Sequence, residues 1–311
     1  MQTGESRGGC VVCGSGEAHT SVSDPIDYEY AVVPENRFEY RRCESCDSEW
    51  LFPRPSDAEI AAFYPEGYHA YNDDHGIVAR LLVGMRSAVR GRKYRSLLPN
   101  GRGSLFDVGA GDTRHFRELA QYADFEFSGV EIQPDVAARA REQGYDIATG
   151  TLETMDVTPH EGRHDIVSMN HVIEHVADTI EVMSKIQRML RPGGWVIGQL
   201  PTNTGWESRV FGSTWAGYHY PRHLQVFSRK GLASLLERTG FTNTKIQSYP
   251  HCQIAISVQN ALLEWGWKPR MEFGRSPIYG VLLAASLPFE VLAAVCNRSG
   301  VINFSARKPA A

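Results

Sequence analysis

The sequence begins without the apolar segment that a secretory signal requires: its first ten residues, MQTGESRGGC, are mostly polar. We therefore expect a cytoplasmic protein. An excess of basic residues is also lacking, since 32 Lys and Arg stand against 36 Asp and Glu, for a net charge of −4. The composition therefore predicts no general attraction to nucleic acid. Internal repeats and low-complexity segments are absent as well.

The chain does have the length and composition of a soluble globular protein, with 311 residues, 42% of them hydrophobic. From Ser104 onward, apolar runs that end in glycine alternate with helical patterns, which predicts a parallel α/β sheet with right-handed crossovers. We expect a small module over residues 1–55, a helical connector over 56–100 and a main domain over 101–311. Within the main domain we expect a helical insertion at 251–299 and a last strand in VINFSARKP.

Four of the six cysteines form two C-x-x-C pairs, which are Cys10 with Cys13 and Cys43 with Cys46. Two such pairs can surround one tetrahedral zinc ion, and the missing export signal favours a metal over disulfides. Four sulfur ligands leave no position for water, so we predict a structural Zn²⁺. Cys252 and Cys296 lie in apolar contexts, and we expect both in the core.

The first strand of the main domain ends in Asp107-Val-Gly109-Ala-Gly111, and the second ends in Glu131. Glycines at such a turn let the backbone approach a ligand, and the carboxylate of Glu131 can accept hydrogen bonds from ribose hydroxyls. These features suit NAD and other adenosine ligands alike. Arg114 stands where a dinucleotide site would have its third glycine, and Asp107 suits a ligand with an ammonium and a sulfonium. An NAD-dependent enzyme is therefore disfavoured.

The runs LFDVGAGDTRHF, SGVEIQPD and DIVSMNHVIEHVADTIEVMSKIQRMLRPGGWVIGQLP resemble the class I S-adenosylmethionine (SAM)-dependent methyltransferases. The resemblance covers roughly residues 104–249. It implies a Rossmann-like, doubly wound sheet of seven strands whose last strand is antiparallel and lies beside the fifth. It also implies SAM as the cofactor. The sequence departs from the family at Thr113, where a third glycine is common.

The resemblance places the cofactor at the carboxyl ends of the first, second and fourth strands. Glu131 would bind the ribose, Ile132 would pack on the adenine, and Asn170 with His171 would lie near the sulfonium. The site residues that it implies are Asp107, Gly109, Ala110, Gly111, Glu131, Ile132, Leu152, Glu153, Asn170 and His171.

The cysteine pairs and the segments WLFPRP and FYPEGYHAYN look similar to methyltransferases of sugar and natural-product pathways, which carry a zinc-ribbon-like module. Some of these methylate carbon on nucleotide-linked deoxysugars, and others methylate oxygen. The resemblance implies that Tyr64, Tyr68 and Tyr71 fold over the cofactor as a lid. Packing in a connector between modules is the alternative for these tyrosines.

The loop GYHYPRHLQVFS begins shortly after the fifth strand, where the fold places the acceptor. A hydroxyl acceptor needs a base, and imidazole suits that role at neutral pH. We predict His223 as the base ahead of His219, with Tyr218 or Arg222 orienting an imidazole or holding an anion. His223 could instead have only a structural role before the next helix.

Two further histidines, His171 and His175 in NHVIEH, are rival candidates for the base, and His171 is expected nearer the cofactor. The relatives that methylate sugar carbon have a carboxylate in the loop where this chain has Pro221-Arg222. Its absence favours methylation of oxygen.

The sequence therefore predicts a SAM-dependent methyltransferase that acts on a small molecule, such as a hydroxyl of a sugar or secondary metabolite. A C-methyltransferase of a nucleotide-linked sugar is the alternative, and a SAM-sensing binding protein is the non-enzyme alternative. Residues 276–299 are apolar, interrupted by Pro288 and Glu290. They would either roof the acceptor pocket or contact a membrane that holds a lipid-linked acceptor. The oligomeric state is open.

Overall fold

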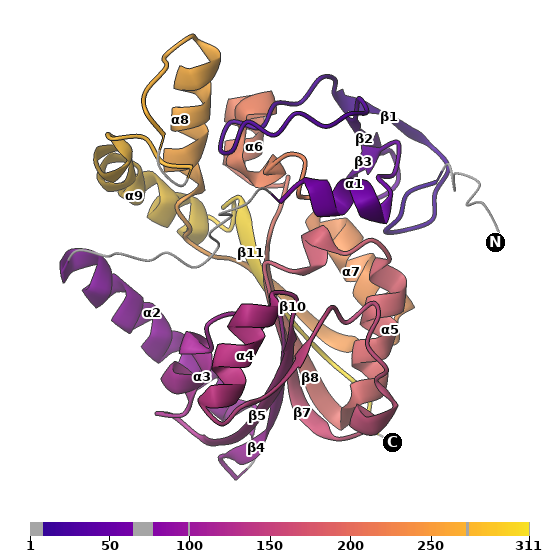
Figure 1. Cartoon of the computed structure of the whole chain (residues 1–311). Coiled ribbons are helices and arrows are strands. Elements are labelled where there is room, and N and C mark those ends of the chain that lie inside the picture. The colour runs from indigo at the N-terminus through magenta and orange to yellow at the C-terminus, as the bar shows by residue number, and fades with distance from the viewer. Residues whose placement is uncertain (1–8, 65–76, 99, 272–273, 311) are drawn as a thin grey trace.

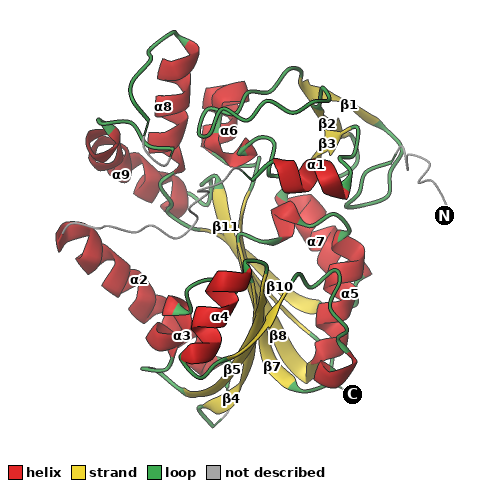
Figure 2. Ribbon diagram, in the orientation of Figure 1, coloured by secondary structure: helices red, strands yellow, loops and turns green. Residues whose placement is uncertain are grey.

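A computed structural model describes residues 9–64, 77–98, 100–271 and 274–310 of the chain, without the side chains of 77–86. Its centre is a seven-stranded sheet in the order β10-β11-β8-β7-β4-β5-β6 (Figures 1 and 2). The strands are β4 (Arg102–Val108), β5 (Asp124–Glu131), β6 (Asp146–Thr149), β7 (His164–Asn170), β8 (Leu190–Pro201), β10 (Thr242–Ser248) and β11 (Val301–Arg307).

The sheet has the predicted topology. Strands β6, β5, β4, β7 and β8 pair in parallel, whereas β11 is antiparallel to both β8 and β10. The last strand in sequence therefore lies beside the fifth, as the resemblance implied. The carboxyl ends of the parallel strands meet at one edge, which is the edge where such sheets bind ligands.

Helices cover both faces of the sheet (Figure 1). One face carries α2 (Ile77–Ser96), α3 (Arg114–Leu119) and α4 (Pro134–Glu142), and the other carries α5 (Thr179–Met189) and α7 (Arg229–Arg238). Pro134 stands at the start of α4, and Asp178 and Ser228 accept hydrogen bonds from Glu181 N and Gly231 N at the starts of α5 and α7.

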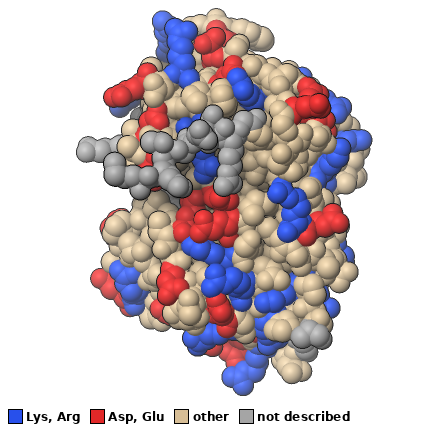
Figure 3. Space-filling view, turned by 90° about the vertical axis from the view of Figure 1, so that its right-hand side faces the viewer, with Lys and Arg blue, Asp and Glu red and all other residues tan. Residues whose placement is uncertain are grey.

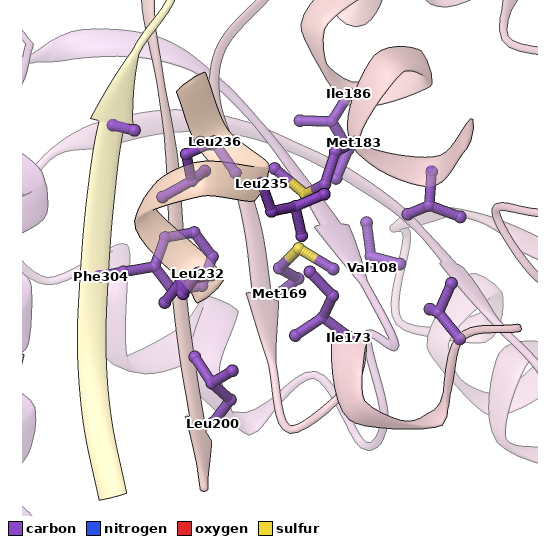
Figure 4. Close-up of a cluster of buried hydrophobic side chains, with 14 of the residues drawn as sticks. Val108, Met169, Ile173, Met183, Ile186, Leu200, Leu232, Leu235, Leu236 and Phe304 are labelled. Atoms are coloured by element: carbon purple, nitrogen blue, oxygen red, sulfur yellow. The ribbon is translucent and has the colours of Figure 1, made fainter. Parts of the chain in front are cut away.

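The core between α5, α7 and the sheet is made of large aliphatic side chains (Figure 4). Leu232, Leu235 and Leu236 of α7 are fully buried. Burial of each such side chain stabilises the folded state by roughly 1.5–3 kcal/mol. This packing fixes the two helices and, with them, the loops at the carboxyl edge of the sheet.

The N-terminal module has its own four-stranded antiparallel sheet in the order β1-β2-β3-β9. Its strands are β1 (Ala18–Val22), β2 (Glu39–Cys43), β3 (Glu49–Phe52) and β9 (Gln225–Val226). Strand β9 belongs to the segment GYHYPRHLQVFS, so a part of the main domain completes the sheet of the module. The module also shares a hydrophobic cluster with α7. The division of the chain into a module, a connector and a main domain at residues 55 and 100 remains a prediction.

Most of the remaining helices lie at the carboxyl edge. They are α1 (Asp57–Ala62), α6 (Trp206–Phe211), α8 (Gln253–Glu264), α9 (Tyr279–Val295) and the short 3-10 turns η2 (Ile173–His175), η3 (Gly212–Thr214) and η4 (Ala216–Tyr218). The 3-10 turn η1 (Thr158–His160) lies instead at the amino end of β7, where His160 contacts His164. Helices α8 and α9 lie within residues 251–299, where a helical insertion was expected, and they pack on each other. Within the described residues, no helix combines the length and the apolar character needed to cross a membrane.

The prediction that Cys252 and Cys296 lie in the core was wrong. Cys296 is exposed and Cys252 is half-buried. Cys296 follows α9, a helix that buries only a small part of its apolar surface and leaves Val281, Phe289 and Val295 exposed. Apolar residues next to Cys296 in the sequence therefore do not place it in the core, because α9 packs on the molecule along one side only.

Candidate functional site

The glycine-rich turn after β4 has the backbone shape that a close-approach loop requires. Gly109 and Gly111 have positive φ angles of 76° and 55°. A Cβ on Gly109 would lie 2.9 Å from the side chain of Val172, so the turn lies against the segment that follows β7. Thr113 adopts φ 57°, the left-handed conformation that a glycine would adopt more easily. The turn therefore forms despite the missing third glycine.

Asp107 is a buried carboxylate with a fixed orientation, 3% exposed. Ser168 on the neighbouring strand donates a hydrogen bond from its hydroxyl to Oδ1 over 2.5 Å. Oδ2 lies 3.1 Å from Nδ1 of His115. Asp107 therefore holds its negative charge beside the glycine turn in one position, as a site for a cationic cofactor requires.

Glu131 at the end of β5 joins the second strand to the glycine turn. Its Oε2 accepts a hydrogen bond from Gly111 N over 2.8 Å, and its Oε1 accepts one from Gln133 N over 2.9 Å. Both oxygens of Glu131 therefore hold the backbone at this edge, and contact of Glu131 with ribose hydroxyls remains a prediction. The next residue, Ile132, is 62% exposed and offers an apolar surface at the same edge.

The turn after β6 lies on α5. Leu152 is buried, and Lys185 donates from Nζ to its carbonyl oxygen over 3.0 Å. Glu153 accepts hydrogen bonds at Oε1 from Ala177 N and Asp178 N, over 2.8 and 3.2 Å. The carboxylate of Glu153 therefore anchors the segment before α5. Contact of this turn with an adenine remains a prediction.

His171 directly follows Asn170, the last residue of β7, and its side chain is 36% exposed. Its Nδ1 lies 3.3 Å from Oε1 of Glu174, and its Nε2 lies 3.0 Å from Oε1 of Gln199 on β8. Burial disfavours the imidazolium, but the Glu174 carboxylate and Gln199 outweigh it, so the pKa of His171 is raised. His171 is thus an accessible imidazole paired with a carboxylate.

Two residues of the loop, His219 and Arg222, bind acids of the N-terminal module. Arg222 donates from both terminal nitrogens to Asp27, over 2.8 and 3.0 Å, and its side chain is fully buried. Its Nε donates to Nε2 of His219 over 2.9 Å, and Nδ1 of His219 lies 2.8 Å from Glu29. Both nitrogens of His219 are therefore engaged, and the role of Arg222 in orienting a catalytic imidazole remains a prediction.

His223 and Tyr218 are packed rather than open. His223 is 8% exposed, and its Nδ1 lies 2.8 Å from the carbonyl oxygen of Gly217. Burial, together with the neighbouring imidazoles, holds the pKa of His223 well below its ordinary value. The hydroxyl of Tyr40 lies 2.7 Å from the carbonyl oxygen of His223 and 3.0 Å from that of Tyr218. The module therefore contacts the loop backbone directly.

His175 links the loop to the segment before α5. Its Nδ1 lies 2.9 Å from the carbonyl oxygen of Arg222 and 3.1 Å from the hydroxyl of Tyr64. Tyr64 is the member of the proposed tyrosine lid that the structure describes, whereas Tyr68 and Tyr71 lie outside the described residues. The ring of His175 packs edge-on against that of His223, 4.7 Å between centroids.

Sequence reasoning missed several partners in this site, above all Asp27, Glu29, Glu174 and Gln199. Asp27 and Glu29 lie about 190 residues before the loop that they bind, and no local pattern marks them. Glu174 carried a signal, since it is a carboxylate between two candidate histidines in NHVIEH.

The four N-terminal cysteines converge as predicted. Their sulfur atoms all lie within 4.8 Å of one another, with 3.6 Å from Cys10 to Cys46 and 3.5 Å from Cys13 to Cys43. Zinc–sulfur bonds of about 2.3 Å in a tetrahedron separate the sulfurs by roughly 3.8 Å. In each pair, the carbonyl oxygen of the first cysteine accepts a hydrogen bond from the backbone nitrogen of the residue four positions later, over 2.8 and 3.0 Å. The two pairs therefore form the same kind of turn. The donor set fits a Zn²⁺ ion.

A polar cavity of about 570 Å³ lies between the module and the main domain. The residues that line it include Arg42, Glu49, Asn203, Arg209 and Tyr218. This volume is in the range of sites for small organic ligands. The face of the molecule in Figure 3 carries acidic and basic side chains side by side over its described residues.

A family description of a methyltransferase domain matches residues 85–246, more than half of the chain. The chain therefore belongs to this family. Over 98 residues it is 30% identical to a ubiquinone biosynthesis O-methyltransferase of Hydrogenovibrio crunogenus, a match that covers 30% of this chain and 40% of that protein. The match thus spans less than half of the relative.

Two solved structures share the fold. Phosphoethanolamine N-methyltransferase 2 of Haemonchus contortus has a TM-score of 0.53 and 16% identity, covering 84% of this chain and 62% of that one. The cyclase SpnF has a TM-score of 0.50 and 17% identity, covering 81% and 90%. Together with the sheet order and the family match, these findings confirm the fold of the class I SAM-dependent methyltransferases.

Proposed function

We propose that the protein transfers the methyl group of SAM to a hydroxyl oxygen of a polar small molecule, with His171 as the base. The observation that carries this proposal is the pairing of His171 with Glu174 at the end of β7, next to the glycine turn. A base there would stand beside the predicted position of the sulfonium. Its raised pKa suits proton removal near neutral pH.

In the proposed reaction, the acceptor oxygen attacks the methyl carbon in line with the sulfur. The bond between sulfur and methyl carbon breaks, and its electron pair remains on the sulfur of S-adenosylhomocysteine. His171 takes the hydroxyl proton, and Glu174 stabilises the imidazolium that forms. Asp107 and Glu131 would hold the ammonium and the ribose of SAM.

The loop histidine His223 is the second candidate for the base. Its Nδ1 lies at a backbone carbonyl, which leaves Nε2 with the lone pair. Burial argues against His223 as the base, since His223 is 8% exposed whereas the side chain of His171 is 36% exposed. His219 has both ring nitrogens engaged. Accessibility therefore favours His171.

The side chains around His171 support a polar acceptor, because Glu174, Gln199 and His251 are all polar. A sugar or a hydroxylated metabolite fits this chemistry, and a nucleotide-linked sugar methylated at carbon is the alternative. A lipid-linked acceptor has separate support, since α9 exposes Val281, Phe289, Leu292 and Val295. In the four-cysteine cluster we place a structural Zn²⁺, which the sulfur separations support.

The test is transfer of labelled methyl from SAM into an extract of the source organism, followed by partition between water and organic solvent. We expect label in the aqueous phase and a loss of about 10²–10⁴-fold with His171→Ala. The matched control is His19→Ala, because His19 lies exposed on β1. Label in the organic phase would instead indicate a lipid acceptor. Unchanged transfer in His171→Ala with loss in His223→Ala would move the base to the loop.

A further inference from the structure

Glu174, His175 and His223 form a second cluster of metal-ligating side chains, separate from the four cysteines. One ligand atom of each lies within 4.8 Å of those of the other two. Glu174 and His175 belong to η2 after β7, and His223 belongs to the loop after η4. The main chain thus brings two distant segments together around a small volume.

Glu174 supplies the strongest reason for a bound cation. Its side chain is fully buried, and neither carboxylate oxygen has a hydrogen-bond partner among the described residues. The cation nearest to it is His171, whose Nδ1 lies 3.3 Å from Oε1 and carries charge only when protonated. A buried carboxylate without donors is costly unless a positive charge compensates it. Within the described part of the chain, Oε2 of Glu174 has no hydrogen-bond partner, and a cation bound there would compensate its negative charge.

The two imidazoles are oriented as metal ligands usually are. His175 has Nδ1 2.9 Å from the carbonyl oxygen of Arg222, and His223 has Nδ1 2.8 Å from that of Gly217. A proton on each Nδ1 satisfies these carbonyls and leaves the lone pair on Nε2. Each ring can therefore offer Nε2 to a metal ion.

We propose that Glu174, His175 and His223 bind one divalent first-row transition metal ion at the carboxyl edge of the sheet. Two nitrogen ligands and one carboxylate favour Zn²⁺, Fe²⁺ or Co²⁺ over Mg²⁺ or Ca²⁺, which prefer all-oxygen sites. Three protein ligands leave at least one position for an oxygen ligand, either water or an acceptor oxygen. A metal on Nε2 of His223 also removes that atom as a proton acceptor, which agrees with His171 as the base.

The test is a Co²⁺ titration of protein whose four-cysteine site is already loaded with Zn²⁺. We expect a visible absorption band of Co²⁺ with nitrogen and oxygen ligands, without the near-ultraviolet band of cobalt–thiolate bonds, saturating at one ion per chain. Glu174→Gln and His223→Ala should each weaken Co²⁺ binding by more than about tenfold. His19→Ala removes an exposed histidine and should leave the titration unchanged.

Absence of the nitrogen–oxygen Co²⁺ band in the wild-type protein would overturn the proposal, and so would equal affinity in all variants. If the variants unfold, as judged by circular dichroism, pulsed electron paramagnetic resonance of Cu²⁺ in the wild-type protein replaces them. Couplings from two imidazoles are then expected, and none would overturn the site. SAM binding, measured by calorimetry in the same samples, separates failure here from failure of the methyltransferase proposal, because the cofactor site lies on other residues.

Discussion

Gly129 on β5 has no room for a side chain, because a Cβ there would lie 2.5 Å from the carbonyl oxygen of Asp107. A methyl group would push β5 away from β4 and would displace Asp107 and Glu131, the two acids that we propose hold the cofactor. We predict that Gly129→Ala destabilises the fold by about 1–3 kcal/mol and weakens SAM binding. Thermal unfolding and calorimetric titration with SAM measure the two effects.

Gly280→Ala is the control for that substitution, because nothing lies within 4 Å of a Cβ at Gly280 on α9. Alanine is also the better helix former, so this variant should be as stable as the wild-type protein or slightly more so. Equal SAM affinity in Gly129→Ala and the wild-type protein would show that the sheet absorbs the methyl group without moving the cofactor residues.

His171 gives the activity a pH dependence whose direction follows from its raised pKa. A general base works only when unprotonated, so kcat should rise as the pH rises through the raised pKa of His171, which lies above about 6.5. We predict that His171→Ala abolishes this acid limb. A pH profile of kcat from about pH 5 to 9 tests it. If His223→Ala removes the limb instead, the base lies in the loop.

At the scale of elements, the sequence was sufficient for the sheet and the glycine turn but not for the contacts that hold the loop. The parallel sheet followed from alternating apolar runs and helical patterns, and the antiparallel last strand beside the fifth followed from the resemblance. Gly111 and Glu131 were both predicted as site residues, but the hydrogen bond between them was not. Strand β9 could not be predicted, because Gln225–Val226 is too short to have a period and depends on β3 for its pairing. The Asp27–Arg222 pair likewise depends on tertiary structure alone.

The Asp27–Arg222 pair joins the module to the loop, and both side chains are buried. Burial raises the pKa of Asp27, but the hydrogen bonds and charge of Arg222 outweigh it, so the pKa is lowered overall. We predict that Asp27→Asn lowers the free energy of unfolding by about 3–5 kcal/mol at neutral pH, because it leaves the buried Arg222 unpaired. Urea denaturation measures the loss.

The pH dependence of this loss has a definite sign. A depressed carboxyl pKa stabilises the fold above the unfolded pKa of about 3.9, and the contribution disappears as the pH falls through the lower folded value. The difference between wild type and Asp27→Asn should therefore shrink below about pH 4. Asp135→Asn is the matched control, because its ion pair with Arg139 is largely exposed and should contribute less than about 1 kcal/mol. An equal loss in both variants would contradict a special role for the buried pair.

At the scale of the whole molecule, the N-terminal module and the methyltransferase domain form one folded unit. Strand β9 of the loop pairs with β3 of the module, and Asn203 after β8 donates to the carbonyl oxygen of Asp47 over 2.7 Å. Arg238 at the end of α7 donates to Val12 over 2.5 Å, within the first cysteine pair. A metal in the cysteine cluster would therefore stabilise the loop as well as the module.

Removal of zinc should consequently affect stability and methyl transfer together. Without the ion, the cysteine turns lose their cross-link, β2 and β3 loosen, and the loop loses the strand that holds β9. We predict that a chelator or Cys43→Ser lowers the Tm and reduces kcat, with a smaller effect on SAM affinity, because the glycine turn follows β4 in the main domain. Zinc content, thermal unfolding and SAM calorimetry on the same samples separate these effects. Cys296→Ser, which changes an exposed thiol outside the cluster, should retain zinc, Tm and kcat. A zinc-free protein with unchanged Tm and kcat would mean that the module folds without its metal and that the packing against α7 alone holds the loop.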